Sequence, residues 1–236
     1  MSLYWILNLT SLSVPFLVSF HPRIQLYKKW KALSLAIILA MIPYIIWDIW
    51  FTENGYWGFN LEYLSGVYLL HLPIEEWFFF VSIPYACIFT HYALIELFPK
   101  VQVGVKQVNF ITYLLLCIFL IGAIVFHQKW YTFIDLVFGL VILVIAFMSN
   151  KALLQKFYLT FIIMLIPFFV VNGILTGTGI ENEVVWYNDL QNLGIRLGTI
   201  PIEDSVYAFS LILLNLVLFE KFSRIKKGEP IDSPKF

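Results

Sequence analysis

The chain has 236 residues, of which 61% are hydrophobic and only 13% are charged, and its 15 basic side chains balance its 15 acidic ones. Soluble domains carry about 25% charged residues, so this composition argues against a soluble enzyme, and the zero net charge gives no reason to expect nucleic acid as a partner. Cys87 and Cys117 each lie inside a long apolar run, which argues against a disulfide framework.

Seven apolar runs are long enough to cross a bilayer, because a hydrocarbon core about 30 Å thick needs roughly 20 residues of helix. In chain order, they are Leu3–Phe20, Ala32–Phe51, Pro73–Phe98, Val108–Phe126, Trp130–Met148, Phe157–Leu175 and Pro201–Phe219. We expect a charged break at Asn150–Lys156 between the fifth and sixth runs. The first run follows no basic segment, which favours a span over a cleaved signal peptide. The predicted fold class is an all-α integral membrane protein with seven transmembrane helices.

The basic residues predict the orientation of these spans. With seven spans, only Lys129 and Arg196 of the 15 basic residues fall on the side of the N-terminus. Since Lys and Arg concentrate on the cytoplasmic side, we expect the N-terminus outside and the C-terminus inside, with a basic tail that includes Lys226, Lys227 and Lys235. Most acidic residues, and every tryptophan except Trp30, fall at the outer end of the spans.

The second and third runs resemble the sixth and seventh. Met41-Ile42-Pro43 matches Leu165-Ile166-Pro167. The matched positions that follow are Asp48 with Asn172, Thr52 with Thr176, Asn60 with Asn188, Gly66 with Gly194, and Pro73-Ile74-Glu75-Glu76 with Pro201-Ile202-Glu203-Asp204. Agreement over this length indicates an internal duplication.

The position of the fourth run makes the two repeats parallel, because three spans alone would invert the second copy. We therefore expect a first repeat at residues 1–98, a linking span at 99–128 and a second repeat at 129–236. Parallel repeats are related by an axis along the membrane normal, and binding sites commonly lie at their interface.

The two Pro-Ile-acid-acid motifs predict a shared site. Proline followed by acids is also an ordinary way to start a helix, but two copies at one depth, near Asp48 and Asp135, indicate more. Ionisable groups within spans are costly and usually face a cavity. Because neighbouring residues of a helix point about 100° apart, we expect one acid of each pair to face the cavity and the other to cap the helix or orient its neighbour.

Other motifs are missing from the sequence. It contains no Gly-x-Gly-x-x-Gly motif after a strand, no P-loop, no His-Glu-x-x-His and no Cys/His cluster, so we expect neither a dinucleotide cofactor nor a bound metal. The last span has no internal lysine for a retinal Schiff base, and no pair of aspartate-rich motifs suggests a diphosphate substrate.

The doubled pattern of an Asp or Asn late in one span, then Asn-x5-Gly and Pro-Ile-Glu-(Glu/Asp), resembles the membrane lycopene cyclases in their fused two-repeat form. The first repeat carries Asp48, Asn60 and Gly66 before its motif, and the second carries Asn172, Asn188 and Gly194. The second copy departs from the first in having Asn172 where Asp48 stands.

The resemblance implies a redox-neutral cyclisation of lycopene, through γ-carotene, to β-carotene. A protonated carboxyl group donates a proton to a terminal double bond, and a carboxylate later removes one. Glu75 and Glu203 are expected as the primary acid and base. The other expected catalytic residues are Glu76, Asp204 and Asp48, and the expected supporting or substrate-binding residues are Asn60, Asn172, Asn188, Trp47, Trp50, Trp77 and Asp135.

The same pattern leaves other readings open. A cyclase that makes ε rings or acts on longer C50 carotenoids has the same requirements, and the ring type depends on which proton leaves. A proton-coupled transporter would need a polar path to the inner side, whereas the inner halves of the spans are nearly all apolar. A seven-span photoreceptor or assembly factor is a further alternative. The expected partners are lycopene and γ-carotene in the bilayer, and other carotenoid enzymes, in a bacterial or archaeal cell membrane.

Overall fold

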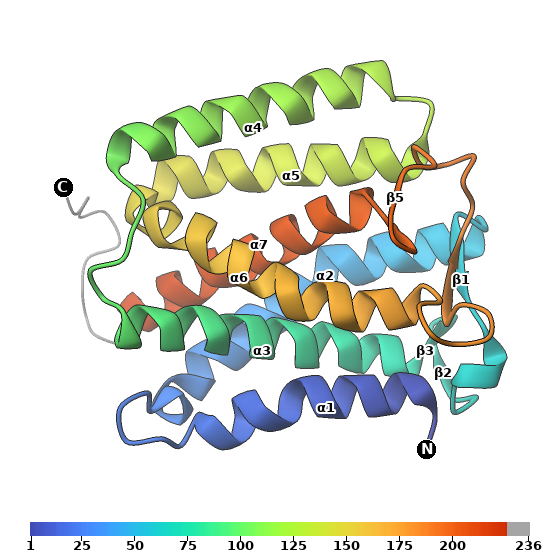
Figure 1. The fold of residues 1–236 in the computed structure, drawn as a ribbon, viewed down its shortest axis with the longest axis horizontal. Coiled ribbons are helices and arrows are strands. Elements are labelled where there is room, and N and C mark those ends of the chain that lie inside the picture. The colour runs from blue at the N-terminus through green and yellow to red at the C-terminus, as the bar shows by residue number, and fades with distance from the viewer. Residues whose placement is uncertain (226–236) are drawn as a thin grey trace.

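Seven α-helices make up most of residues 1–225, the part of the chain that the computed structural model describes (Figure 1). Their bounds are α1 Leu3–Val18, α2 Trp30–Glu53, α3 Ile74–Leu97, α4 Val105–Val125, α5 Trp130–Ser149, α6 Lys151–Leu175 and α7 Glu203–Ile225. The all-α class is confirmed. The basic residues Lys226, Lys227 and Lys235 lie outside the described residues.

Six helices, α2 to α7, are long and apolar enough to cross a membrane. Their composition makes the chain an integral membrane protein. The remaining helix, α1, is apolar but has only 16 residues, which rise about 24 Å.

The predicted break at Asn150–Lys156 is wrong in length, because α6 begins at Lys151, one residue after Asn150. The Asn150 side chain accepts a hydrogen bond from the Leu153 amide (3.1 Å), which caps the new helix. Gln155 donates to the Val103 carbonyl (3.1 Å), and the Lys151 ammonium lies 4.3 Å from the Phe147 ring centroid. These polar residues form the first turns of the helix instead of a loop.

The two halves of the chain use the same packing pairs. Helix α1 lies along α3, α5 lies along α7, and α4 packs on the outer side of α5 (Figure 1). Helix α2 packs against α7 and helix α6 against α3, so each half contributes to the other. The bundle core is rich in aromatic residues, including Tyr44, Phe80 and Phe157.

Short strands gather at the end of the bundle that holds the N-terminus (Figure 1). Two small hairpins, β2 (Tyr68–Leu69) with β3 (Leu72–Pro73) and β5 (Arg196–Leu197) with β6 (Ile200–Pro201), lead into α3 and α7. The strands β1 (Trp57–Phe59) and β4 (Val185–Tyr187) pair antiparallel, with Gly58 opposite Trp186. Strands of two or three residues leave no periodic signal in a sequence, which is why we expected only loops here.

The β1–β4 pair joins the two halves symmetrically. The backbone amide of Asn60 donates to the Val184 carbonyl (2.8 Å), and the backbone amide of Asn188 donates to the Tyr56 carbonyl (2.9 Å). These are matched positions of the duplication, so the two hydrogen bonds are equivalent under the pseudo-symmetry that relates the repeats. It holds the starts of α3 and α7 at one end of the bundle.

Candidate active site

The two acid pairs occupy equivalent places at the starts of α3 and α7. Each helix is preceded by its hairpin, and the Ile74 and Ile202 amides donate to the Val67 and Ile195 carbonyls at 2.9 and 3.0 Å. All four acidic side chains are buried. The repeated local fold therefore places two carboxyl groups from each half in the interior.

The first acid of each pair binds the loop that precedes its helix. Glu75 Oε1 accepts hydrogen bonds from the Ser65 amide (2.6 Å) and the Ser2 hydroxyl (2.9 Å). Glu203 Oε1 accepts from the Leu193 amide and the Thr132 hydroxyl, both at 2.7 Å. Neither residue lines the cavity described below. Both residues instead anchor the preceding loop to the start of the helix.

The second acid of each pair points the other way and is bound by a tyrosine from the first helix of its repeat. Tyr4 of α1 donates its hydroxyl proton to Glu76 Oε2, and Tyr131 of α5 donates to Asp204 Oδ1. The matched tyrosines extend the duplication to the first and fifth helices.

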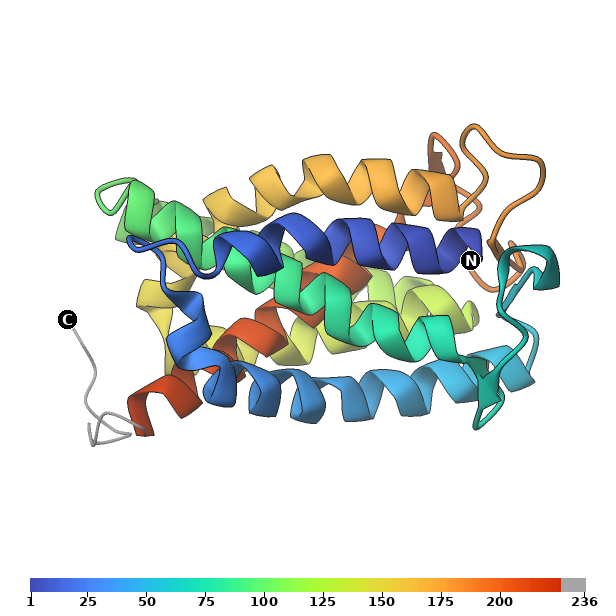
Figure 2. The ribbon, with the colours of Figure 1, turned by 90° about the horizontal axis from the view of Figure 1, so that it is seen from below.

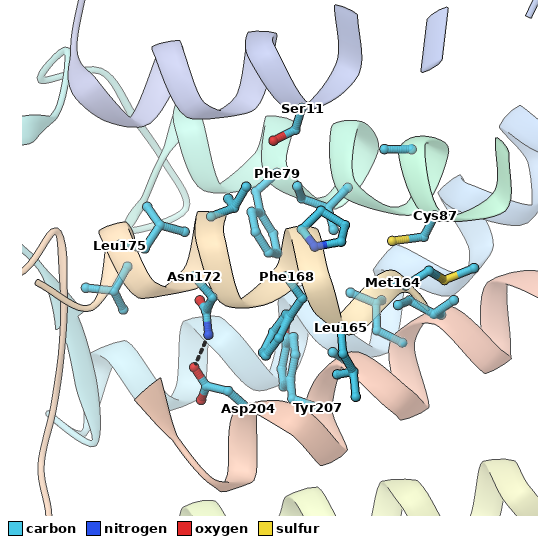
Figure 3. Close-up of a pocket in the computed structure, with 18 of the residues that line it drawn as sticks. Ser11, Phe79, Cys87, Met164, Leu165, Phe168, Asn172, Leu175, Asp204 and Tyr207 are labelled. Carbon is cyan, nitrogen blue, oxygen red and sulfur yellow. Dashed lines mark hydrogen bonds between the residues drawn. The ribbon is translucent and has the colours of Figure 1, made fainter. Parts of the chain in front are cut away.

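Asp204 accepts two more hydrogen bonds than Glu76 does. Its Oδ2 accepts from the Asn172 amide nitrogen (2.6 Å), as Figure 3 shows, and from the Tyr187 hydroxyl (3.0 Å). Burial, and then the charge of Asp204, raises the pKa of Tyr187 well above its usual range, so this phenol stays protonated and acts as a donor. Three donors around one carboxyl group favour its ionised form.

Asp48 stands in the first repeat where Asn172 stands in the second. Its Oδ1 accepts a hydrogen bond from the Trp57 indole nitrogen (2.7 Å), while Oδ2 is buried without a partner in residues 1–225. Asp48 and Glu76 line the same cavity, which is described next. One repeat thus holds two neighbouring carboxyl groups, and the other holds a carboxyl group with an amide.

A cavity of about 460 Å³ connects these groups. Its walls include Asp48, Glu76, Asp204 and Asn172, the aromatic rings of Trp57, Phe79, Tyr187 and Tyr207, and many aliphatic side chains. Figure 3 shows Phe79, Asn172, Asp204 and Tyr207 among them. Its volume is that of a small-molecule site. The polar groups lie towards the strand end of the helices, and the apolar part extends along α1, α3, α6 and α7.

Helices α1 and α6 run next to each other (Figure 2), and the exposed residues that line the cavity place its opening between them. Thr10 and Val14 of α1 and Pro167 of α6 line the cavity and are also exposed. The Thr10 hydroxyl donates to the Ile6 carbonyl of its own helix (2.8 Å), so it offers the cavity no free donor.

The other predicted residues lie outside the cavity walls. Asn60 and Asn188 accept from the Glu62 and Leu190 amides, both at 3.1 Å, and so shape turns. The Trp77 indole donates to the Leu69 carbonyl (3.0 Å).

Two tryptophans and Asp135 complete this group. Trp47 packs against Trp57, with ring centroids 6.0 Å apart, and Trp50 is partly exposed. Asp135 is fully buried, and neither of its oxygens has a hydrogen-bond partner in the described part of the chain.

Most of the cavity residues were missed in the sequence, among them Tyr4, Trp57, Tyr131 and Tyr187, which bear on the acids. Tyr4 and Tyr131 were accessible to sequence reasoning, because they stand at matched positions near the starts of the first and fifth spans. Trp57 and Tyr187 face each other in the β1–β4 pair, and that contact depends on how the two loops meet.

Comparison with known proteins identifies the family of the chain. No curated protein and no solved structure matches the chain. The model of the lycopene cyclase family matches residues 1–94 and 127–222, two segments that each hold one acid pair and that leave out the whole of α4. The match covers most of the chain, which therefore belongs to the lycopene cyclase family.

Proposed function

We propose that the chain is a lycopene β-cyclase, which converts the linear end groups of lycopene, through γ-carotene, into the rings of β-carotene. The observation that carries the proposal is the placement of three carboxyl groups, Asp48, Glu76 and Asp204, at one end of an apolar cavity that opens sideways. A polyene dissolved in the bilayer can enter such a cavity without crossing water.

The acid role is assigned to the Asp48–Glu76 pair. In the second repeat, the Asn172 amide donates to Asp204. A protonated Asp48 has the same shape and the same donor capacity towards Glu76. Two close carboxyl groups that share a proton separate into one acid and one base. The proton held by this pair is the one delivered to the substrate.

The base role is assigned to Asp204, whose three donors favour the carboxylate. The sequence pattern put Glu75 and Glu203 first for acid and base, but their oxygens bind loop amides away from the cavity. We therefore assign these two residues to the support of Glu76 and Asp204.

The proposed reaction conserves atoms and electrons. The Asp48–Glu76 pair donates a proton to one carbon of the terminal double bond, and a C–H bond forms. The neighbouring double bond attacks the resulting cation and closes the ring. Asp204 then removes a proton from a carbon beside the new cationic centre, which restores a double bond. Trp57, Tyr207 and Phe79 present aromatic faces that stabilise the cation.

Orientation and location form a second part of the proposal. We place all seven helices across the bilayer, with the acids towards the outside, because 13 of the 15 Lys and Arg residues fall on the opposite side (15 minus Lys129 and Arg196). The proposed location is the cell membrane of a bacterium or archaeon, where lycopene and γ-carotene dissolve and other carotenoid enzymes act.

The test is pigment analysis by liquid chromatography in a lycopene-producing host. Wild type is expected to form β-carotene, whereas Glu76→Gln and Asp204→Asn are expected to leave lycopene unchanged. Glu62→Gln is the matched control, because Glu62 is exposed in an outer loop and its loss should not change the pigments. Unconverted lycopene with well-inserted wild type would reject a lycopene cyclase, and ε rings in the product would reject the β-ring assignment.

A further inference from the structure

The duplication provides two equivalent spaces in the bundle, yet the cavity occupies only one of them. The paired contacts Tyr4–Glu76 and Tyr131–Asp204 align α1 with α5 and α3 with α7. The cavity extends between α1, α3, α6 and α7. Its counterpart would lie between α5, α7, α2 and α3, where the large aromatic residues described next lie outside the walls of this cavity.

Three small side chains of the cavity correspond to three large aromatic ones on the other side. Ser11, Val171 and Ala208 line the cavity. Their matched positions carry Phe138, Trp47 and Phe80, in the same order.

These aromatic residues form one packed cluster with Tyr44. The ring centroids of Trp47 and Phe138 are 5.0 Å apart, those of Tyr44 and Phe138 5.4 Å, and those of Tyr44 and Phe80 6.4 Å. Tyr44, Trp47 and Phe80 are buried. The cluster fills the space that is open in the other half.

The counterpart of the lateral opening is also covered. Trp50 of α2 meets Trp130 of α5 edge to face, with centroids 5.3 Å apart. Helix α4 packs along α5 (Figure 1), whereas the described chain places no such helix over α1. A long apolar molecule therefore has one side entrance, between α1 and α6.

We infer that the small volumes of Ser11, Val171 and Ala208 create the only working substrate cavity of the described chain. This inference rests on the proposed function and specifies where its substrate binds. Acids from both repeats serve this one cavity, so the two ends of a symmetric polyene are cyclised one after the other, with release or reversal of the molecule between the two events.

The experiment transfers the aromatic residues of the filled side to the open side. Ser11→Phe copies Phe138 and Ala208→Phe copies Phe80. Each is expected to lower β-ring formation at least tenfold in membranes that contain equal amounts of inserted protein, because the added ring occupies substrate space. Ser13→Phe is the matched control: Ser13 lies on the same helix, is exposed and does not line the cavity, so this variant should keep wild-type activity.

Ser11→Ala separates volume from chemistry. It removes the hydroxyl, which donates to the Leu7 carbonyl of its own helix (2.7 Å), and leaves the cavity open, so this variant should form rings at least fivefold faster than Ser11→Phe. A Ser11→Ala variant as inactive as Ser11→Phe would overturn the inference. So would near-normal activity of both Ser11→Phe and Ala208→Phe.

A time course of ring formation by the wild type tests the same inference without depending on whether a variant folds. A single cavity requires the one-ringed product to rise first and the two-ringed product to follow after a lag. Two-ringed product without that lag would overturn the inference. If the wild type leaves lycopene unchanged, the proposed function fails; if the wild type cyclises lycopene while both filled variants remain active, only the single-cavity inference fails.

Discussion

Replacing Asp48 by asparagine makes the first repeat copy the second, where Asn172 occupies the same position. The substitution keeps the size of the side chain and the oxygen that accepts from Trp57. Its new amide nitrogen takes the place of Asp48 Oδ2, which has no hydrogen-bond partner in residues 1–225. The one property that is lost is the proton that the Asp48–Glu76 pair can share.

The expected cost falls on the rate and not on folding. A positioned general acid contributes about 10²–10⁴-fold, which corresponds to roughly 3–5 kcal/mol of barrier. Because the hydrogen bonds can be kept, we expect the free energy of unfolding to change by no more than about 1 kcal/mol. Asp48→Ala, by contrast, loses the Trp57 contact and should lower both quantities.

The assay measures initial rates of ring formation from lycopene in liposomes, with the thermal unfolding midpoint of the same preparation. A rate at least a hundredfold below wild type at an unchanged midpoint would support the shared proton. An Asp48→Asn variant within threefold of the wild-type rate would refute the assignment of the acid role to the Asp48–Glu76 pair.

Three further outcomes are expected. Glu203→Gln weakens the hydrogen bonds from Leu193 and Thr132 and should lower the free energy of unfolding by about 1–3 kcal/mol, measured as a lower thermal unfolding midpoint. Its rate of ring formation should fall less than that of Asp204→Asn, and a larger fall would return Glu203 to the base role. Tyr187→Phe removes one of three hydrogen-bond donors to Asp204 and should slow ring formation about tenfold, which corresponds to one hydrogen bond to a charged group. The rates are compared at equal amounts of inserted protein, and an unchanged rate would count against Asp204 as the base. Gly58→Ala would place a methyl group against the Trp186 indole and should destabilise the protein more than Gly66→Ala, which meets no neighbour but forces alanine to a φ of +80°; thermal unfolding of both variants gives the comparison.

Hydropathy predicted the helices well, because each buried or lipid-facing helix needs a long apolar run whatever its neighbours are. The start of α6 escaped this reasoning: Lys151 and Lys156 look like a loop, yet they lie in helical turns near the end of the bundle, where polar side chains find partners.

The position of the site was predictable from the doubled Pro-Ile-acid-acid motif, but the direction of each side chain was not. Helical geometry requires Glu75 and Glu76 to diverge without stating which one faces inwards. That choice depends on Ser65 and Leu193, whose backbone amides donate hydrogen bonds to the first acid of each pair. These contacts arise from the loop conformation, and no periodic pattern in the sequence reports it.

A duplicated chain with one cavity explains why the two repeats differ where they do. The repeats differ in their polar groups at Asp48 and Asn172. In the proposed mechanism, Asp48 shares a proton with Glu76, whereas Asn172 donates a hydrogen bond to the ionised Asp204. Differences in volume fall at Ser11, Val171 and Ala208, which open one side of the bundle and fill the other. The β1–β4 pair must hold both halves together for either difference to matter, since Asp48 and Glu76 come from one repeat and Asp204 from the other. Neither repeat alone contains both the proposed acid and the proposed base, so the proposed site belongs to the joined pair.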